Sequence, residues 1–167
     1  EAIGLVSVVD NVITGTSNGF TAIRMSKVPD ARVTGNQVRT TAADQFWSAP
    51  TALELVGASL SKRHYVANND FAIGTVNIKN ANELGLFGNS IRMLLVDSGQ
   101  SGNHGIVHGN RFGGIFLASA MITARGMWKV SDNIAPVAIS ITGATHQEGL
   151  VWVGPLLTAG NYTRFRD

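Results

Sequence analysis

Residues 86–91 read LFGNSI and residues 107–112 read VHGNRF, with an asparagine in fourth place in both. Four other segments fit the same frame: VVDNVI (8–13), VTGNQV (33–38), VANNDF (66–71) and VSDNIA (130–135). The six asparagines are Asn11, Asn36, Asn69, Asn89, Asn110 and Asn133, so the steps between them are 25, 33, 20, 21 and 23 residues. Self-similarity at such a spacing is the sequence signature of a repeat architecture, so this motif is the best guide to the fold.

Three positions of the repeat have a clear physical meaning. The residue three before each asparagine is Val or Leu, and the residue two after it is Ile, Val, Phe or Ala. The residue immediately before it is Asp, Gly or Asn, the types that most readily adopt a left-handed backbone. The motif therefore predicts a short strand, a sharp bend at one residue, an asparagine and a second strand.

A unit of this length cannot bury its own apolar side chains, so the units must stack on one another. Stacking places equivalent strands about 4.8 Å apart in parallel pairs, and like residues then fall into columns. We predict an all-β parallel solenoid of about six or seven coils over residues 1–142, with an insertion at about residues 40–50. The asparagines are expected to bond to the bend backbone and to one another as a ladder. Residues 143–167 lose the motif and are expected to cap the stack or to mediate oligomerisation.

Second strands are predicted between the bends, where apolar and polar residues mostly alternate. They cover residues 21–25, 51–55, 75–79, 115–117 and 137–141.

The repeated V-x-(G/D/N)-N-x-(I/V/F) motif resembles the right-handed, single-stranded parallel β-helix of the pectate-lyase-like superfamily, which includes bacteriophage tailspikes. The resemblance covers roughly residues 6–142. It implies right-handed coils and, for a tailspike, a homotrimer that contacts host-surface polysaccharide. It indicates little about chemistry, because the motif is structural.

Composition excludes several other classes of protein. Charged residues make up 14% and apolar residues 44% of the 167 residues, with 19 Gly, which favours a compact β-rich chain over a disordered one or a helical bundle. The net charge of +2 comes from scattered Lys and Arg, so nucleic acid is not an expected partner. The absence of Cys excludes disulfides, a thiolate zinc site and a thiol nucleophile. The longest weakly polar stretch, residues 113–124, is too short to span a bilayer, so no membrane insertion is expected. The chain starts without Met or a signal peptide, as expected for a processed product or a fragment.

The candidate binding residues form an outward row centred on Glu54. Arg24 is expected one coil before it and Asn77 or Lys79 one coil after it, a row that could bind an acidic or hydroxylated sugar. The same row is also typical of an ordinary surface ladder of opposite charges. Glu54 is the weak candidate for a catalytic acid, and Trp47 in the insertion could stack on a sugar ring or simply cover a coil.

No metal or cofactor site is predicted. His104 and His108 have a helical metal-ligand spacing, but the glycines around them predict a loop and a bend. An outward Phe116 and the unalternated run Met93–Val96 suggest instead that one flank packs on another chain.

The leading functional hypothesis is a trimeric virion attachment protein, resembling a phage tailspike or tail fibre and contacting host-surface glycan. Two alternatives remain open. One is a polysaccharide lyase, hydrolase or epimerase that uses Glu54 with Arg24 or Lys79, and the other is a purely structural assembly or decoration protein. The expected location is the virion tail or the extracellular space.

Overall fold

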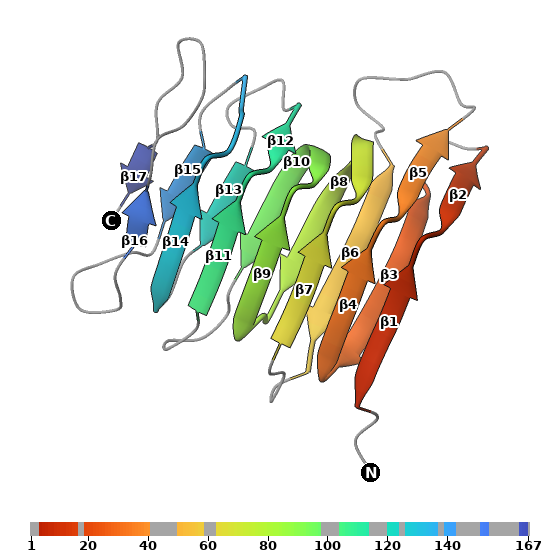
Figure 1. The fold of residues 1–167 in the computed structure, drawn as a ribbon, viewed down its shortest axis with the longest axis horizontal. Helices are drawn as coiled ribbons and strands as arrows, with labels where there is room; N and C mark the ends of the chain where they lie inside the picture. The colour runs from red at the N-terminus through yellow and green to blue at the C-terminus, as the bar shows by residue number, and fades with distance from the viewer. Residues whose placement is uncertain are drawn as a thin grey trace.

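The computed structural model describes residues 4–16, 19–40, 50–58, 63–97, 104–113, 120–123, 126–136, 139–142, 151–153 and 164–166. Within these ranges the chain forms β-strands and short connections, and no helix. Every strand pairing is parallel, and equivalent strands from successive passes of the chain lie side by side (Figure 1). The protein is therefore a parallel β-solenoid, as the repeat predicts. The six corner asparagines mark six successive coils, which enclose about five full turns of the chain.

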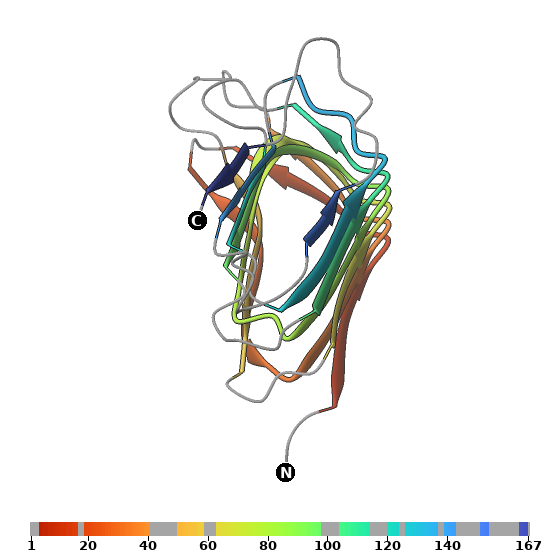
Figure 2. The ribbon, with the colours of Figure 1, turned by 90° about the vertical axis from the view of Figure 1, so that its left-hand side faces the viewer.

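Two sheets form the walls of the solenoid and face each other when the molecule is viewed along the stack (Figure 2). The seven-stranded sheet consists, in spatial order, of β1 (Leu5–Val9), β4 (Asp30–Thr34), β7 (Arg63–Ala67), β9 (Glu83–Phe87), β11 (His104–His108), β14 (Met127–Ser131) and β16 (Val151–Val153). The ten-stranded sheet consists of β2 (Val12–Gly15), β3 (Thr21–Val28), β5 (Gln37–Thr40), β6 (Thr51–Gly57), β8 (Asp70–Lys79), β10 (Ser90–Asp97), β12 (Arg111–Phe112), β13 (Ala120–Thr123), β15 (Ile139–Thr142) and β17 (Arg164–Arg166).

The predicted second strands fall in the ten-stranded sheet. Residues 21–25 and 51–55 lie within β3 and β6, whereas residues 75–79 are the second half of the continuous strand β8. The strand predicted at residues 137–141 corresponds to β15, which begins at Ile139. The strand expected at residues 115–117 lies outside the described residues, as does most of the insertion expected at residues 40–50.

Columns of apolar side chains fill the space between the sheets. The residue three positions before each corner asparagine lines the inner face of the seven-stranded sheet. In the five later coils this residue is fully buried: Val33, Val66, Leu86, Val107 and Val130. The ten-stranded sheet contributes the column Met25, Leu55, Ile78, Val96, Ile122 and Ile141. Burial of these columns is the main source of stability, because no single coil could exclude water from its own side chains.

One sharp corner joins each of the first six strands of the seven-stranded sheet to the ten-stranded sheet. At this corner, which we call the ladder corner, the residue before the asparagine has a positive φ in all six coils: Asp10, Gly35, Asn68, Gly88, Gly109 and Asp132, with φ between 55° and 68°. The predicted left-handed bend is thus confirmed at every position, which explains why only Asp, Gly and Asn occur there.

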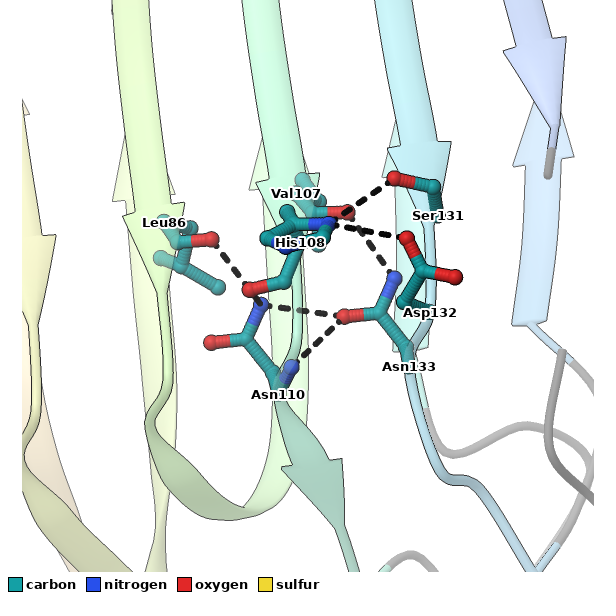
Figure 3. A network of polar contacts seen from close by, with 7 residues as sticks. All are labelled: Leu86, Val107, His108, Asn110, Ser131, Asp132 and Asn133. Carbon is teal, nitrogen blue, oxygen red and sulfur yellow. Dashed lines mark hydrogen bonds and ion pairs between the residues drawn. The ribbon is translucent and has the colours of Figure 1, made fainter. Parts of the chain in front are cut away.

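The asparagine ladder is also confirmed. The Nδ2 of each asparagine donates to the Oδ1 of the next at 2.9–3.0 Å, from Asn11 through Asn36, Asn69, Asn89 and Asn110 to Asn133. The backbone N–H of each donates to that same Oδ1 at 2.9–3.1 Å. From Asn36 onward, Nδ2 also donates to a backbone carbonyl of the preceding coil, as Asn110 and Asn133 do to Leu86 and Val107 (Figure 3). The five amides from Asn36 to Asn133 are buried, and those of Asn36, Asn69, Asn89 and Asn110 use both Nδ2 hydrogens and Oδ1, as a buried polar row must.

Candidate functional site

The row predicted around Glu54 exists on the outer face of the ten-stranded sheet. Arg24 pairs with Glu54 in register, and Glu54 pairs with Asn77. The Arg24 Nε lies 3.0 Å from the Glu54 Oε2, with the Arg24 side chain largely exposed. Lys79 is one row away, beside Val56. Trp47 lies outside the described residues.

A groove of about 500 Å³ lies instead on the outer face of the seven-stranded sheet, across β1, β4 and β7, at the red-to-yellow end of the stack in Figure 1. We call it the Arg–Tyr groove, and its lining residues are Leu5, Asp30, Ala31, Arg32, Arg63 and Tyr65. It combines two guanidinium groups, one carboxylate and one aromatic ring. Such a set can hold an anionic sugar, because Arg binds carboxylate or sulfate with two donors and a Tyr ring offers a flat apolar face.

Asp30 and Glu83 flank Arg63 along one row of this face. The Asp30 Oδ1 accepts a hydrogen bond from the backbone N–H of Arg63 at 2.9 Å, and the Arg63 Nε lies 3.1 Å from the Glu83 Oε2. His104 follows Glu83 in the same row. The Arg63 side chain is 81% exposed, so its ion pair adds little to stability and leaves the guanidinium accessible to solvent.

Arg32 differs from Arg63 in having no ion pair or side-chain hydrogen bond with the described part of the chain. It is exposed and lies in register between Ser7 and Tyr65. A guanidinium that no described residue neutralises can bind an anionic ligand.

Tyr65 stands on the groove wall with its ring held by a neighbour. Its ring centroid lies 5.5 Å from that of Phe87 in a tilted arrangement, and the residue is 43% exposed. Gly85 lies beside Tyr65 in register, and a Cβ built on it would come within 2.6 Å of the Phe87 ring. The small residue therefore leaves room for the aromatic pair, which presents a supported ring face to solvent.

A second hollow, of about 250 Å³, lies further along the same sheet between β11 and β14. Its lining residues are His104, Gly105, Ile106, Met127, Trp128 and Lys129. The exposed side chains of Ile106 and Met127 make it more apolar than the Arg–Tyr groove. The outer face of the sheet thus offers a charged end and an apolar end to a long ligand.

His108 brings a serine and a carboxylate together at the ladder corner (Figure 3). The His108 Nδ1 lies 3.0 Å from the Ser131 Oγ and 3.1 Å from the Asp132 Oδ2. A nucleophilic triad needs the two imidazole nitrogens to serve different partners, whereas here both partners meet the same nitrogen. The cluster is therefore a contact between neighbouring coils and not a hydrolase triad.

Metal-ligand clusters and membrane-spanning helices are both absent from the residues that the structure describes. No group of three or more His, Cys, Asp or Glu side chains could hold a metal ion. No described helix is long and apolar enough to cross a membrane.

The Arg–Tyr groove was missed by sequence reasoning, which placed the candidate binding residues around Glu54 and in the insertion. The signal that could have found it lies in the repeat itself. The position six before each ladder asparagine holds Leu5, Asp30, Arg63, Glu83, His104 and Met127, and the position four before holds Ser7, Arg32, Tyr65, Gly85, Ile106 and Lys129. These are two outward rows of the seven-stranded sheet, so the ladder register alone brings the groove residues together.

Neither a known family, nor a curated protein, nor a solved structure matches this chain in comparisons with known proteins.

Proposed function

We propose that this chain is a surface-attachment protein that binds an acidic polysaccharide along the outer face of its seven-stranded sheet. The Arg–Tyr groove is the observation that carries the proposal. It places the guanidinium of Arg32, which pairs with no described residue, the guanidinium of Arg63 and the supported ring of Tyr65 on one regular wall. Equivalent strands repeat about every 4.8 Å, so a sugar chain could cross several coils in an extended form.

The specific form that we propose is a trimeric virion attachment protein of the tailspike or tail-fibre type, located on the virion tail. The support for it is the resemblance of the corner motif to the right-handed pectate-lyase-like β-helix together with the parallel solenoid. One fold can host many functions, so the proposal is tested by binding.

The binding experiment presents bacterial capsular and lipopolysaccharide glycans on an array. We expect binding that is lost, by about tenfold or more, when Arg32 and Arg63 are both changed to Ala, because two charge-assisted contacts disappear. Arg24→Ala is the matched control, since Arg24 also pairs with a glutamate on an outer face, at 3.0 Å against 3.1 Å for Arg63. Loss of binding in Arg24→Ala alone would place the site on the Glu54 row, as first predicted from sequence.

A hydrolase or lyase is the second candidate, and one observation favours it. Asp30 and Glu83 stand two strands apart on either side of Arg63, which separates their backbones by about 10 Å. Inverting glycosidases also act with two carboxylates that lie more than one strand spacing apart, at about 6.5–9.5 Å. Reducing ends or unsaturated products released from the bound glycan, and abolished in Glu83→Gln, would establish this alternative. If the protein neither binds nor cleaves the glycan, the purely structural role is favoured.

Self-association is proposed through the outer face of the ten-stranded sheet. Leu95 continues the Arg24–Glu54–Asn77 row, and Met121 follows it, so the row changes from charged to apolar along the stack. Met121 is 47% exposed, and Met93 and Leu95 are half-buried. We expect light scattering to give a mass near three chains, and Met121→Asp to shift it toward 17.7 kDa. A monomeric wild-type protein would remove this part of the proposal.

A further inference from the structure

One outward row of the seven-stranded sheet connects the Arg–Tyr groove with the second hollow. Strand pairing places one residue from each of five neighbouring strands in this row, which we call the central row: Arg32 of β4, Tyr65 of β7, Gly85 of β9, Ile106 of β11 and Lys129 of β14. The five strands lie side by side in Figure 1. Residues of the central row line both hollows, so a single extended ligand could occupy the two together.

Positive charge stands at two separated positions of the central row. Arg32 and Lys129 are both exposed, and four strand steps lie between them. At about 4.8 Å for each step, the two residues are about 19 Å apart along the stack. The three positions between them hold uncharged residues. A ligand that follows the row therefore meets two cations with a neutral stretch between them.

This neutral stretch is an apolar floor. Tyr65 and Ile106 are 43% and 42% exposed. The ring of Phe87 covers Gly85 between them, because a Cβ built on Gly85 would come within 2.6 Å of that ring. The same ring lies 5.5 Å from the Tyr65 ring. Two aromatic rings and one aliphatic side chain thus follow one another along the row, and the apolar C–H face of a neutral sugar can pack on such a surface.

A carboxylate borders the middle of the floor. Glu83 points outward from β9, two positions before Gly85, and its side chain is 51% exposed. Its ion pair with Arg63, at 3.1 Å, adds no net charge beside the floor. A ligand carboxylate placed over Gly85 would face Glu83 from the same strand, and this repulsion disfavours an acidic sugar at that position.

We infer, on the basis of the proposed function, that the bound polysaccharide follows the central row and carries its acidic sugars sparsely. One acidic sugar lies at Arg32 and the next at Lys129, with neutral sugars packed on the floor between them. An extended sugar residue spans roughly one strand spacing of about 4.8 Å, so the ligand is an acidic heteropolysaccharide with about one acid in every four sugars. A polymer made only of uronic acids would place carboxylates over the floor and beside Glu83.

The test compares the affinities of three oligosaccharides for the full chain by titration calorimetry. The first is an octasaccharide of deacylated gellan, in which three neutral sugars separate two glucuronates. The second is the gellan tetrasaccharide, with a single glucuronate, and the third is octagalacturonate, with an acid on every sugar. We expect the gellan octasaccharide to bind at least about tenfold more tightly than either of the others, because it alone engages both cations and keeps the floor free of charge.

A variant of the second cation separates this inference from general attraction to anions. Lys129→Gln should remove the advantage of the gellan octasaccharide over the tetrasaccharide and change the affinity for the tetrasaccharide by no more than about twofold. The matched control is Lys27→Gln, at an exposed lysine of β3 in the other sheet, which should leave all three affinities unchanged.

Three results would overturn the inference: equal binding of the gellan octasaccharide and tetrasaccharide, tighter binding of octagalacturonate, or no binding of any of the three probes. The proposed function fails separately, if the glycan array shows no binding or binding that does not depend on Arg32 and Arg63.

Discussion

The two kinds of corner in this solenoid differ in almost every respect. The ladder corner has the same geometry in six coils, with one left-handed residue and one asparagine. The return corner, by which the chain leaves the ten-stranded sheet for the next strand of the seven-stranded sheet, varies from one residue between β3 and β4 to eight between β15 and β16. The difference shows that the side-chain ladder limits corner length, because an asparagine can reach its neighbours only if each corner has the same shape.

The two kinds of corner also differ in how the buried polar side chains near them are hydrogen-bonded. Five of the six ladder asparagines are buried with their amides bonded, whereas His64, which is 1% exposed on the inner face of β7, has no hydrogen-bond partner for either ring nitrogen among the described residues. The Val28 carbonyl and the Asp30 carboxylate, both beside a return corner, favour the charged ring. Burial outweighs them and lowers the pKa of His64 below 6.5.

The largest effect should come from a change in corner length. One Gly inserted between Gly88 and Asn89 would move Asn89 out of reach of Asn69 and Asn110 and should cost more than about 3 kcal/mol in the free energy of unfolding. The same insertion between β10 and β11, in a return corner, should cost less than about 0.5 kcal/mol, because loop closure depends weakly on length. Urea unfolding of both variants measures the contrast, and equal losses would refute the role of the ladder.

Removal of one ladder amide should have the next largest effect. Asn89→Leu should cost about 3 kcal/mol, because Asn69 and Asn110 both lose a buried partner. Asn11→Leu should cost only about 1 kcal/mol, since Asn11 is exposed and has one ladder neighbour. The half-buried Asn77 on the outer face provides the control, and Asn77→Leu should leave thermal melting nearly unchanged.

Backbone strain at the ladder corner should be measurable separately from hydrogen bonding. Gly109 has a φ of 66° and open space around a built Cβ, so Gly109→Ala should cost about 1 kcal/mol from conformation alone. Gly88→Ala should cost more, because its Cβ would also come within 2.7 Å of the Asn68 Oδ1. If both variants melt like the wild type, the left-handed bend is not what selects Gly at these corners.

The smallest effect concerns His64 and pH. The lowered folded-state pKa means that the unfolded chain binds a proton more readily, so stability present above pH 6.5 should be lost as the pH falls from 6.5 toward the folded-state pKa. His64→Leu should remove this part of the pH dependence. The control is His104→Leu, at an exposed position, which should retain it. Denaturant unfolding at pH 7.5 and 5.5 measures the loss of unfolding free energy between the two pH values. The same loss in His64→Leu as in the wild type would contradict the prediction.

The sequence predicted those parts of the molecule that repeat. The bend and the ladder follow from the spacing of the asparagines, because a solenoid converts spacing along the chain into neighbours in space. The Arg24–Glu54 register follows instead from the like sequences TAIRM (21–25) and TALEL (51–55), which align Thr21 with Thr51. The Arg–Tyr groove was missed because its residue types differ from coil to coil, so no column of like residues marks it. The unpartnered state of His64 could not be predicted either, since it depends on what surrounds an inward position and not on the repeat.

All six ladder amides point the same way, with each carbonyl oxygen toward the β1 end and each amino group toward the later coils. Each bond polarises the next, so the individual dipoles add along the axis. The row therefore acts as a single electrical dipole with its negative pole at Asn11, much as the backbone does in a helix. A chain that forms only strands in its described residues thus acquires a helix-like polarity from its side chains.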